Sequence, residues 1–408
     1  MSQGPVIIVG AGLAGLRCAN VLSDAGVDIV VLERGRHVGG RVITDDVDGF
    51  KIDRGFQLLN PSYPQVERGL DLKDLDLQAF DPGMVLSDGV THSQVADPLR
   101  SPGKILATLR APLGPPTSRL QLARLLLALK GKQRKPVTIN PDQPSATWML
   151  EKGIDRTTID ALLRPFLAGV LLEDELETSA RITSLLLRSF TRGVPGVPAG
   201  GMGAIPHQMA ARLGEDVLRL ETPVTAVTAN SVVLEDGSRL EGSAVVLATA
   251  GQAASSLLQT LHAPSSNSVT TWWYSTNEPL RTKATLVVDQ SMKTLINSVE
   301  MTAAAPQYAP PGKYLVAASA IGLHPEVERE RSVRERLSQL HRRSTKEWEL
   351  VSMSLVADAL PRYSSPILLR PEILVNGVFV AGDHRATPSI QGAMASGERA
   401  ARAILAQR

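Results

Sequence analysis

Short apolar runs near the N-terminus alternate with glycine-rich and small-residue segments. Residues 5–9 and 28–32 are dominated by Val, Ile and Leu, and the segment between them opens with closely spaced glycines. Apolar runs of this length next to glycine are typical of strands buried on both faces. The pattern predicts a buried strand, a glycine turn, a helix of small residues and a second buried strand.

A leucine-rich and basic stretch follows in the middle of the chain. Between Pro98 and Pro141 there is no acidic residue, and the basic ones are Arg100, Lys104, Arg110, Arg119, Arg124, Lys130, Lys132, Arg134 and Lys135. Leucines at 120, 122, 125, 126, 127 and 129 predict a helix that is apolar almost all round, which must be buried or meet lipid. Two interpretations stay open: a helix on an anionic membrane surface, or a core helix with solvated cationic ends.

The later pattern predicts two more helices and then a β-rich half. The helices are expected at about 155–172 and 179–192, and short strands at 217–220, 224–227, 231–234 and 244–250. Apolar runs at 284–288 and 314–318 predict an antiparallel sheet, and the charged segment 325–348 predicts an outer helix with a solvated face. A last strand at 378–381 precedes a C-terminal helix.

Composition limits the function classes. The 408 residues carry 43 basic and 41 acidic side chains, so the net charge of +2 argues against a nucleic-acid partner. The single cysteine, Cys18, is expected in the core and favours a reducing compartment. We expect no signal peptide, no transmembrane span and no metal site, and hence a cytoplasmic protein with membrane association as an option.

Candidate chemistry begins in the first glycine turn. Gly10 permits the tight turn, Gly12 lets the backbone approach a pyrophosphate, and Gly15 lets the helix lie against the strand. The amides of Leu13 and Ala14 then belong to a helix N-terminus, which favours phosphate. A carboxylate at residue 33, after the second strand, can accept hydrogen bonds from a ribose and would repel a 2′-phosphate, so NADP is disfavoured. The turn, the helix and this acid together predict dinucleotide binding.

The next segment resembles a known flavoprotein superfamily. Residues 33–41 include Glu33, Arg34, Gly39, Gly40 and Arg41, similar to the ExxxxxGGR extension of the amine oxidase and phytoene desaturase superfamily. The glycine pair offers open backbone amides, and the arginine offers a bidentate phosphate donor. Residues 49–57 resemble the segment that passes beside the flavin ring there, which implies that Gly55, Phe56 and Gln57 lie near it. The resemblance implies FAD as the cofactor.

The resemblance continues towards the C-terminus. Residues 194–206 resemble a PxGGMGxL turn, and residues 378–397 resemble the AGD…SxxGAxxSG motif of phytoene desaturases. It implies that Val224, Thr249 and Ala250 meet the adenine side of FAD. It also implies that the flavin side is held by Gly382, Asp383, Ile390, Gln391, Gly392 and Ala393. A helix N-terminus at the flavin would stabilise the reduced, anionic ring.

These observations predict an α/β fold, with a Rossmann-type FAD-binding domain and an inserted α+β substrate domain of mixed sheet and helices. The FAD domain is expected at 1–61, 200–262 and 366–408. The substrate domain is expected at 62–199 and 263–365, with its helical part at about 98–192.

Candidates for catalysis and substrate contact are fewer. Tyr363 lies in a segment similar to the ALPxY sequence of phytoene desaturases, and His384 follows the flavin-binding aspartate, so both are catalytic candidates. Trp272, Tyr274 and Tyr363 are candidates for lining a substrate cavity. Neighbouring strand residues point to opposite faces, so Trp273 is expected away from Trp272 and Tyr274.

Three functions remain open from the sequence. The first is an FAD-dependent desaturase or dehydrogenase that removes a hydride from an apolar, isoprenoid-like or carotenoid-like small molecule. The second is an amine oxidase that uses dioxygen, and the third is a non-catalytic FAD-binding protein at a membrane surface. Peripheral membrane contact is assigned to about 98–141, and the electron acceptor is open.

Overall fold

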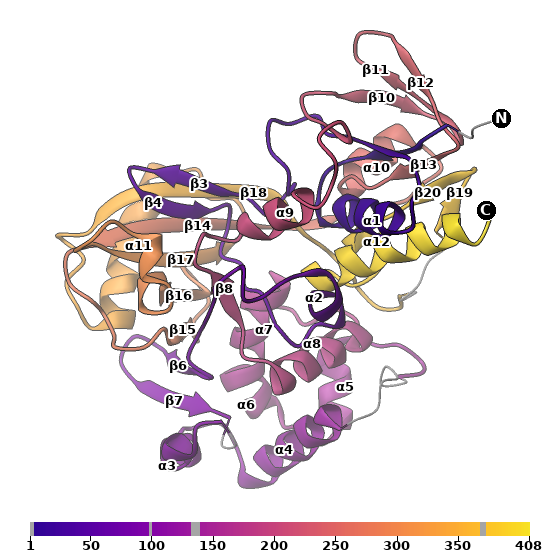
Figure 1. The fold of residues 1–408 in the computed structure, drawn as a ribbon. Coiled ribbons are helices and arrows are strands. Elements are labelled where there is room, and N and C mark those ends of the chain that lie inside the picture. Colours follow the sequence, from indigo (N-terminus) through magenta and orange to yellow (C-terminus); the bar gives the residue numbers. More distant parts are fainter. Residues whose placement is uncertain (1–3, 98–99, 132–138, 368–372) are drawn as a thin grey trace.

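The computed structural model describes residues 4–97, 100–131, 139–367 and 373–408 (Figure 1). Strands from the N-terminal, central and C-terminal parts of the chain form one six-stranded sheet, in the order β19-β20-β13-β1-β2-β9. Its parallel strands are β1 (Val6–Val9), β2 (Ile29–Leu32), β9 (Leu218–Arg219), β13 (Ala244–Leu247) and β20 (Val378–Val380), and β19 (Leu374–Val375) is antiparallel. The predicted first two strands are confirmed.

The two faces of this sheet are covered differently because successive strand residues point to opposite sides. Val6 and Ile8 pack with α1 (Leu13–Asp24) and α12 (Ile390–Leu405), whereas Ile7 and Val9 pack with the opposite layer. That layer consists of β10 (Val224–Val227), β11 (Ser231–Leu234), β12 (Arg239–Glu241) and α10 (Gly251–Leu257). The N- and C-terminal helices therefore lie side by side, as Figure 1 shows.

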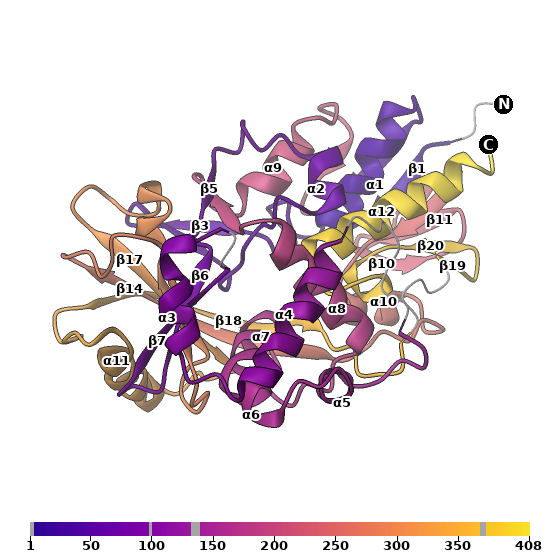
Figure 2. The same cartoon turned by 90° about the horizontal axis from the view of Figure 1, so that it is seen from below.

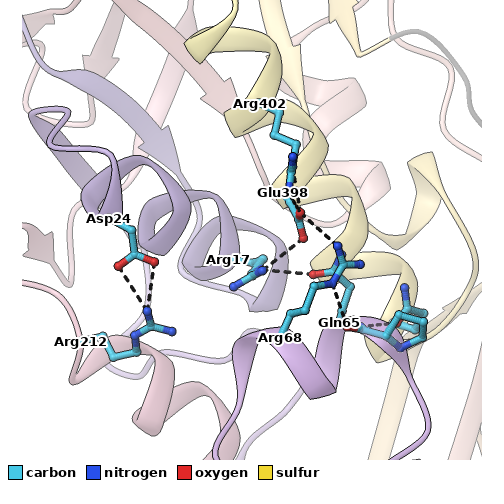
Figure 3. A network of polar contacts seen from close by, with 9 residues as sticks. Arg17, Asp24, Gln65, Arg68, Arg212, Glu398 and Arg402 are labelled. Atoms are coloured by element: carbon cyan, nitrogen blue, oxygen red, sulfur yellow. Dashed lines mark hydrogen bonds and ion pairs between the residues drawn. The ribbon is translucent and has the colours of Figure 1, made fainter.

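The contact between α1 and α12 is close because a glycine stands at it. A Cβ at Gly397 would overlap the carbonyl oxygen of Ala14. A polar cluster around the buried Glu398 joins the same helices to α2 (Pro64–Gly69). Glu398 accepts from the buried Arg17 at 3.1 Å, and the more exposed Arg68 and Arg402 lie against the same carboxylate (Figure 3). These contacts tie both ends of the chain into one unit.

A second sheet of seven strands runs in the order β18-β14-β17-β16-β15-β6-β7. Its strands are β6 (Gly83–Ser87), β7 (His92–Ala96), β14 (Ser266–Thr276), β15 (Leu286–Asp289), β16 (Asn297–Glu300), β17 (Tyr314–Ile321) and β18 (Glu349–Pro361). Only β6 and β15 pair in parallel. The predicted β-rich second half is confirmed, with β6 and β7 added to it from the first hundred residues.

Helices cover both faces of this second sheet. Leu86 and Val288 pack under a helical layer, and Val85 and Val287 pack under α11 (Val327–His341). The layer consists of α3 (Ile105–Arg110), α4 (Pro116–Lys130), α5 (Ser145–Glu151), α6 (Arg156–Thr158), the π-helical turn η2 (Ile159–Leu163), α7 (Arg164–Leu171) and α8 (Ala180–Arg192). The helices predicted at 155–172 and 179–192 are confirmed, the second with Ser179 as its N-cap. No helix in the described ranges is long and apolar enough to cross a bilayer.

Short elements complete the chain. They are β3 (Thr44–Val47), β4 (Phe50–Asp53), β5 (Leu77–Ala79), β8 (Gly196–Pro198), α9 (Ala204–Ala210) and the 3₁₀ turns η1 (Pro102–Lys104), η3 (Met301–Ala303), η4 (Pro306–Tyr308) and η5 (Asp383–Arg385). The predicted domain boundaries stay a prediction.

Candidate cofactor and substrate site

A cavity of about 1590 Å³ is lined by residues of both sheets and of the helical layer. Pockets for single small molecules usually measure about 300–1,000 Å³. The cavity therefore has room for a large cofactor and a second molecule. Its wall begins at the carboxyl end of β1 and includes residues of α3, α4, α7 and α8.

The first glycine turn forms one end of this cavity. Gly10 has a φ of +105°, and a Cβ there would lie 2.9 Å from the carbonyl oxygen of Ala248. A Cβ at Gly15 would overlap the carbonyl oxygen of Gly10, so this glycine serves helix packing and does not reach the wall. A Cβ at Gly12 would meet no atom within 4 Å. The space over Gly12 lies at the N-terminus of α1, which no side chain caps, and such a terminus attracts an anion.

The second glycine pair and two charged residues surround the same space. The amide of Gly39 donates to the carbonyl of Ala11 at 2.8 Å, which places the two glycine segments side by side. Glu33 accepts from the amides of Ala11 and Gly35 at 2.8 and 2.9 Å, and its carboxylate oxygens keep further lone pairs for ribose hydroxyls. This donor and acceptor set fits the dinucleotide part of FAD.

The C-terminal motif closes the site from the other side. Arg41 and Asp383 form an ion pair at 2.7 Å, so residues from the two ends of the chain meet at the wall. The amide of Gly382 donates to Ser396 Oγ at 2.8 Å, and Ser389 caps the amide of Gly392 at 3.1 Å. The first turn of α12 thus faces the cavity with its positive end.

Most of the cofactor-binding residues expected from the sequence lie on the wall, although their contacts with FAD stay a prediction. On the wall are Gly10, Gly12, Leu13, Ala14, Glu33, Arg34, Gly39, Gly40, Arg41, Gly55, Phe56, Gln57, Val224, Thr249, Ala250, Gly382, Asp383, Ile390 and Ala393. Gly15, Gln391 and Gly392 are off it; the Gln391 side chain accepts from the amide of Gln65 at 2.9 Å. Sequence reasoning missed Thr222, Pro223, Ala253, Ser256 and Leu257, which no motif marks.

The remaining part of the cavity is apolar. Its wall consists mainly of Leu, Val, Ile and Phe side chains from the helical layer and the second sheet. These include Leu113, Leu122, Leu126, Leu162, Leu163, Phe166, Val170, Leu186, Leu187, Phe190, Val269, Leu286, Val288 and Ile296. Phe166 and Phe190 form an edge-to-face pair with centroids 5.2 Å apart. This part, which we call the apolar half, suits a substrate with little polar surface.

Trp272 and Tyr274 do not line the cavity, which corrects their prediction as substrate-contacting residues. Both point to the face of β14 covered by α11, where Trp272 stacks on His324 and the Tyr274 hydroxyl donates to Glu330 at 3.1 Å. Trp273 points to the opposite face, as alternation predicts, and is buried in the hydrophobic core that also contains Val6 and Ile8. The error lay in which face meets the cavity.

Tyr363 and His384 also lie off the cavity wall, which corrects the prediction that they act on substrate. The Tyr363 hydroxyl donates to the carbonyl of Asp383 at 2.8 Å, so Tyr363 supports the C-terminal turn. His384 is buried behind Asp383 against Gly251, and burial lowers its pKa to about 4. The imidazole is therefore neutral at physiological pH, and it is not among the residues that line the apolar half.

Together, an uncapped helix N-terminus, a carboxylate beside it and an apolar half are what an FAD-dependent oxidoreductase needs. The model of flavin containing amine oxidoreductases matches residues 13–405. The chain belongs to this family. The match confirms the predicted superfamily, the enzyme class and FAD as cofactor.

Individual relatives divide between two chemistries. Putrescine oxidase of Kocuria rosea is 26% identical over 245 residues, 54% of this chain and 48% of that protein, so the match spans about half of that relative's length. Phytoene dehydrogenase of Streptomyces griseus is 27% identical over 376 residues, 77% of this chain and 72% of that protein.

Solved structures confirm the fold class. Wild-type putrescine oxidase bound to putrescine has a TM-score of 0.75 at 19% identity, with 99% of each chain covered. An oxidoreductase from Methanosarcina mazei also has a TM-score of 0.75, at 18% identity, with 97% of this chain and 99% of that one covered. At these identities the likeness shows the fold alone.

Proposed function

We propose that the protein removes a hydride from an apolar, isoprenoid-like or carotenoid-like substrate, as a desaturase or dehydrogenase. The observation that carries this proposal is the apolar half of the cavity, built by the helical layer and the second sheet. The similarity to phytoene dehydrogenase over 77% of the chain supports it.

The charges of the wall weigh against an amine substrate. An alkylamine is a cation at neutral pH, and burying it costs free energy unless it pairs with a carboxylate or loses its proton. The wall carboxylates next to β6 and β7 are already paired, Asp81 with Lys104 and Asp97 with Arg100. An apolar substrate needs no such partner, whereas an amine at this end of the cavity would compete with Lys104 or Arg100 for one of these carboxylates.

When bound, FAD supplies the two-electron acceptor. In the proposed reaction the substrate loses a hydride from one carbon and a proton to water from the neighbouring carbon, which leaves a carbon–carbon double bond. The chain's own contribution is to hold the substrate against an apolar wall and to direct the positive end of α12 at the site. Among the described residues, His37 is the one histidine that lines the cavity. It lies in the loop with Arg34 and Gly39, at the cofactor end of the cavity.

The amine oxidase interpretation is the second candidate, and the relation to putrescine oxidase favours it. Anaerobic stopped-flow separates the two. The FAD-loaded protein is mixed either with an apolar polyene in detergent micelles or with putrescine, and loss of the visible flavin absorbance is recorded. We expect reduction by the polyene only. Reduction by putrescine alone would overturn the proposal, and reduction by neither, with normal reduction by dithionite, would favour a non-catalytic FAD-binding protein.

A further inference from the structure

Large apolar side chains are exposed together on α3 and α4. Ile105, Leu106 and Leu109 on α3 are 39%, 57% and 63% exposed, and Leu120 and Leu127 on α4 are 52% and 59% exposed. The leucines predicted to surround α4 are therefore split, since Leu122 and Leu129 are buried in the helical layer. Figure 2 shows the two helices facing the viewer from below. We call these five exposed residues the α3–α4 apolar surface.

The helices that carry the α3–α4 apolar surface also carry basic side chains and no acidic ones. Residues 100–131 contain no Asp or Glu. Arg119 is held by the carbonyls of Gly114 and Leu109, and Lys104 is paired with Asp81. The side chains of Arg110, Arg124 and Lys130 make no hydrogen bond or ion pair with another described residue, so their charges remain available. Lys132, Arg134 and Lys135, part of the same basic stretch, lie outside the described residues.

The α3–α4 apolar surface continues into the cavity. Leu109, Ala123 and Leu127 are exposed to solvent and are also part of the cavity wall. They lead to Leu122 and Leu126, which belong to the apolar half. An apolar molecule can thus pass from the outside to the apolar half along apolar side chains.

We infer that the α3–α4 apolar surface docks on an anionic lipid membrane and takes up the apolar substrate directly from it. Burial of the exposed leucines and attraction of the three cations act together at such a surface. A second copy of the chain fits less well, because a symmetric interface would bring like charges together without a counter-charge. The uptake step rests on the proposed function, whereas the docking step does not.

Vesicle flotation tests the docking step without any substrate. The FAD-loaded protein is mixed with vesicles of phosphatidylcholine containing phosphatidylglycerol, or of phosphatidylcholine alone, at low and at high salt. We expect binding to the anionic vesicles that weakens in high salt and is lower with neutral vesicles. Absence of binding to anionic vesicles at low salt would overturn the inference.

Paired variants locate the docking surface. Leu106→Glu with Leu120→Glu changes two exposed residues that are not on the cavity wall. We expect at least tenfold weaker vesicle binding with unchanged FAD content. Leu323→Glu with Val327→Glu, at 45% and 83% exposure near α11, is the matched control and should bind as the wild type does. Equal binding by the two double variants would overturn the inference. It would also be overturned if the protein is a dimer in solution and only the Leu106→Glu, Leu120→Glu variant dissociates it.

A separate readout distinguishes this inference from the proposed function. Replacing Arg124 by Gln removes one cation and should weaken anionic vesicle binding by about fivefold, the effect of one charge near an anionic surface. If vesicle binding follows these expectations and no apolar compound reduces the flavin, docking stands and the proposed function fails. If polyenes reduce the flavin and vesicles do not bind, the reverse holds.

Discussion

Replacement of Gly12 by alanine should separate cofactor binding from folding. Gly12 has φ −74° and ψ 176°, which any residue adopts, and its added Cβ meets no atom within 4 Å. The unfolding free energy of the cofactor-free variant should stay within about 1 kcal/mol of the wild type. The methyl group would occupy the approach of the pyrophosphate to the N-terminus of α1. Loss of one charge-assisted hydrogen bond costs about 1.5–3 kcal/mol, and we expect a Kd for FAD raised about tenfold to a hundredfold.

The matched control is Gly15→Ala, three residues further on in the first turn of α1. Its Cβ overlaps the carbonyl oxygen of Gly10, so α1 must move away from β1, and we expect a loss of about 1–3 kcal/mol in stability. Calorimetric titration of the cofactor-free proteins with FAD gives the affinities, and urea unfolding gives the stabilities. A Gly12→Ala variant with wild-type affinity, or one that loses stability as Gly15→Ala does, would refute the assignment of this space to the pyrophosphate.

Three further predictions follow from other parts of the fold. Burial raises the pKa of Glu398, but hydrogen bonds from Gln65, Arg402 and Arg17 outweigh burial and bring it from 4.5 to about 2. This depressed pKa stabilises the fold above pH 4.5, and the contribution is lost as pH falls towards about 2. In urea unfolding, the unfolding free energy of Glu398→Gln should therefore depend less on pH in that window than that of the wild type. Tyr274→Phe removes a hydrogen bond to Glu330 and should cost about 1.5–3 kcal/mol of unfolding free energy; a changed rate of flavin reduction would show that Tyr274 does reach the substrate. Val170→Asp places a carboxylate in the apolar half and should slow flavin reduction by an apolar substrate at least tenfold, with FAD content unchanged. Val170→Thr should slow it less. Equal rates for both variants would contradict the placement of Val170 on the substrate wall.

The cofactor half could be predicted because its signals are local in the sequence. Gly10 and Gly39 have positive φ values, and Gly15 and Gly397 allow close backbone approach, which only glycine permits. Such requirements fix the residue type at each position, so the two motifs can be recognised in the sequence at either end of the chain. The resemblance assigns both motifs to one ligand, and Arg41 and Asp383, one from each motif, form an ion pair.

The substrate half could not be predicted because its wall comes from distant segments without fixed residue types. Alternation along β14 correctly separates Trp273 from Trp272 and Tyr274, but it does not say which face α11 will cover. Any apolar residue of suitable size serves at Val170 or Leu187, so no motif marks them. His384 follows Asp383 directly, but a turn directs neighbouring side chains to different sides. Tyr363, expected at the substrate from the resemblance to the ALPxY segment, instead donates to the carbonyl of Asp383.

The central claim is that the two ends of the chain enclose a single FAD. The most direct measurement is the number of FAD molecules held per chain after reconstitution and gel filtration, from flavin absorbance and protein concentration. The account predicts one FAD per wild-type chain, and a marked loss both in Gly12→Ala at the N-terminal motif and in Asp383→Ala at the C-terminal motif. A colourless wild-type protein, or full occupancy when the C-terminal motif is changed, would contradict it.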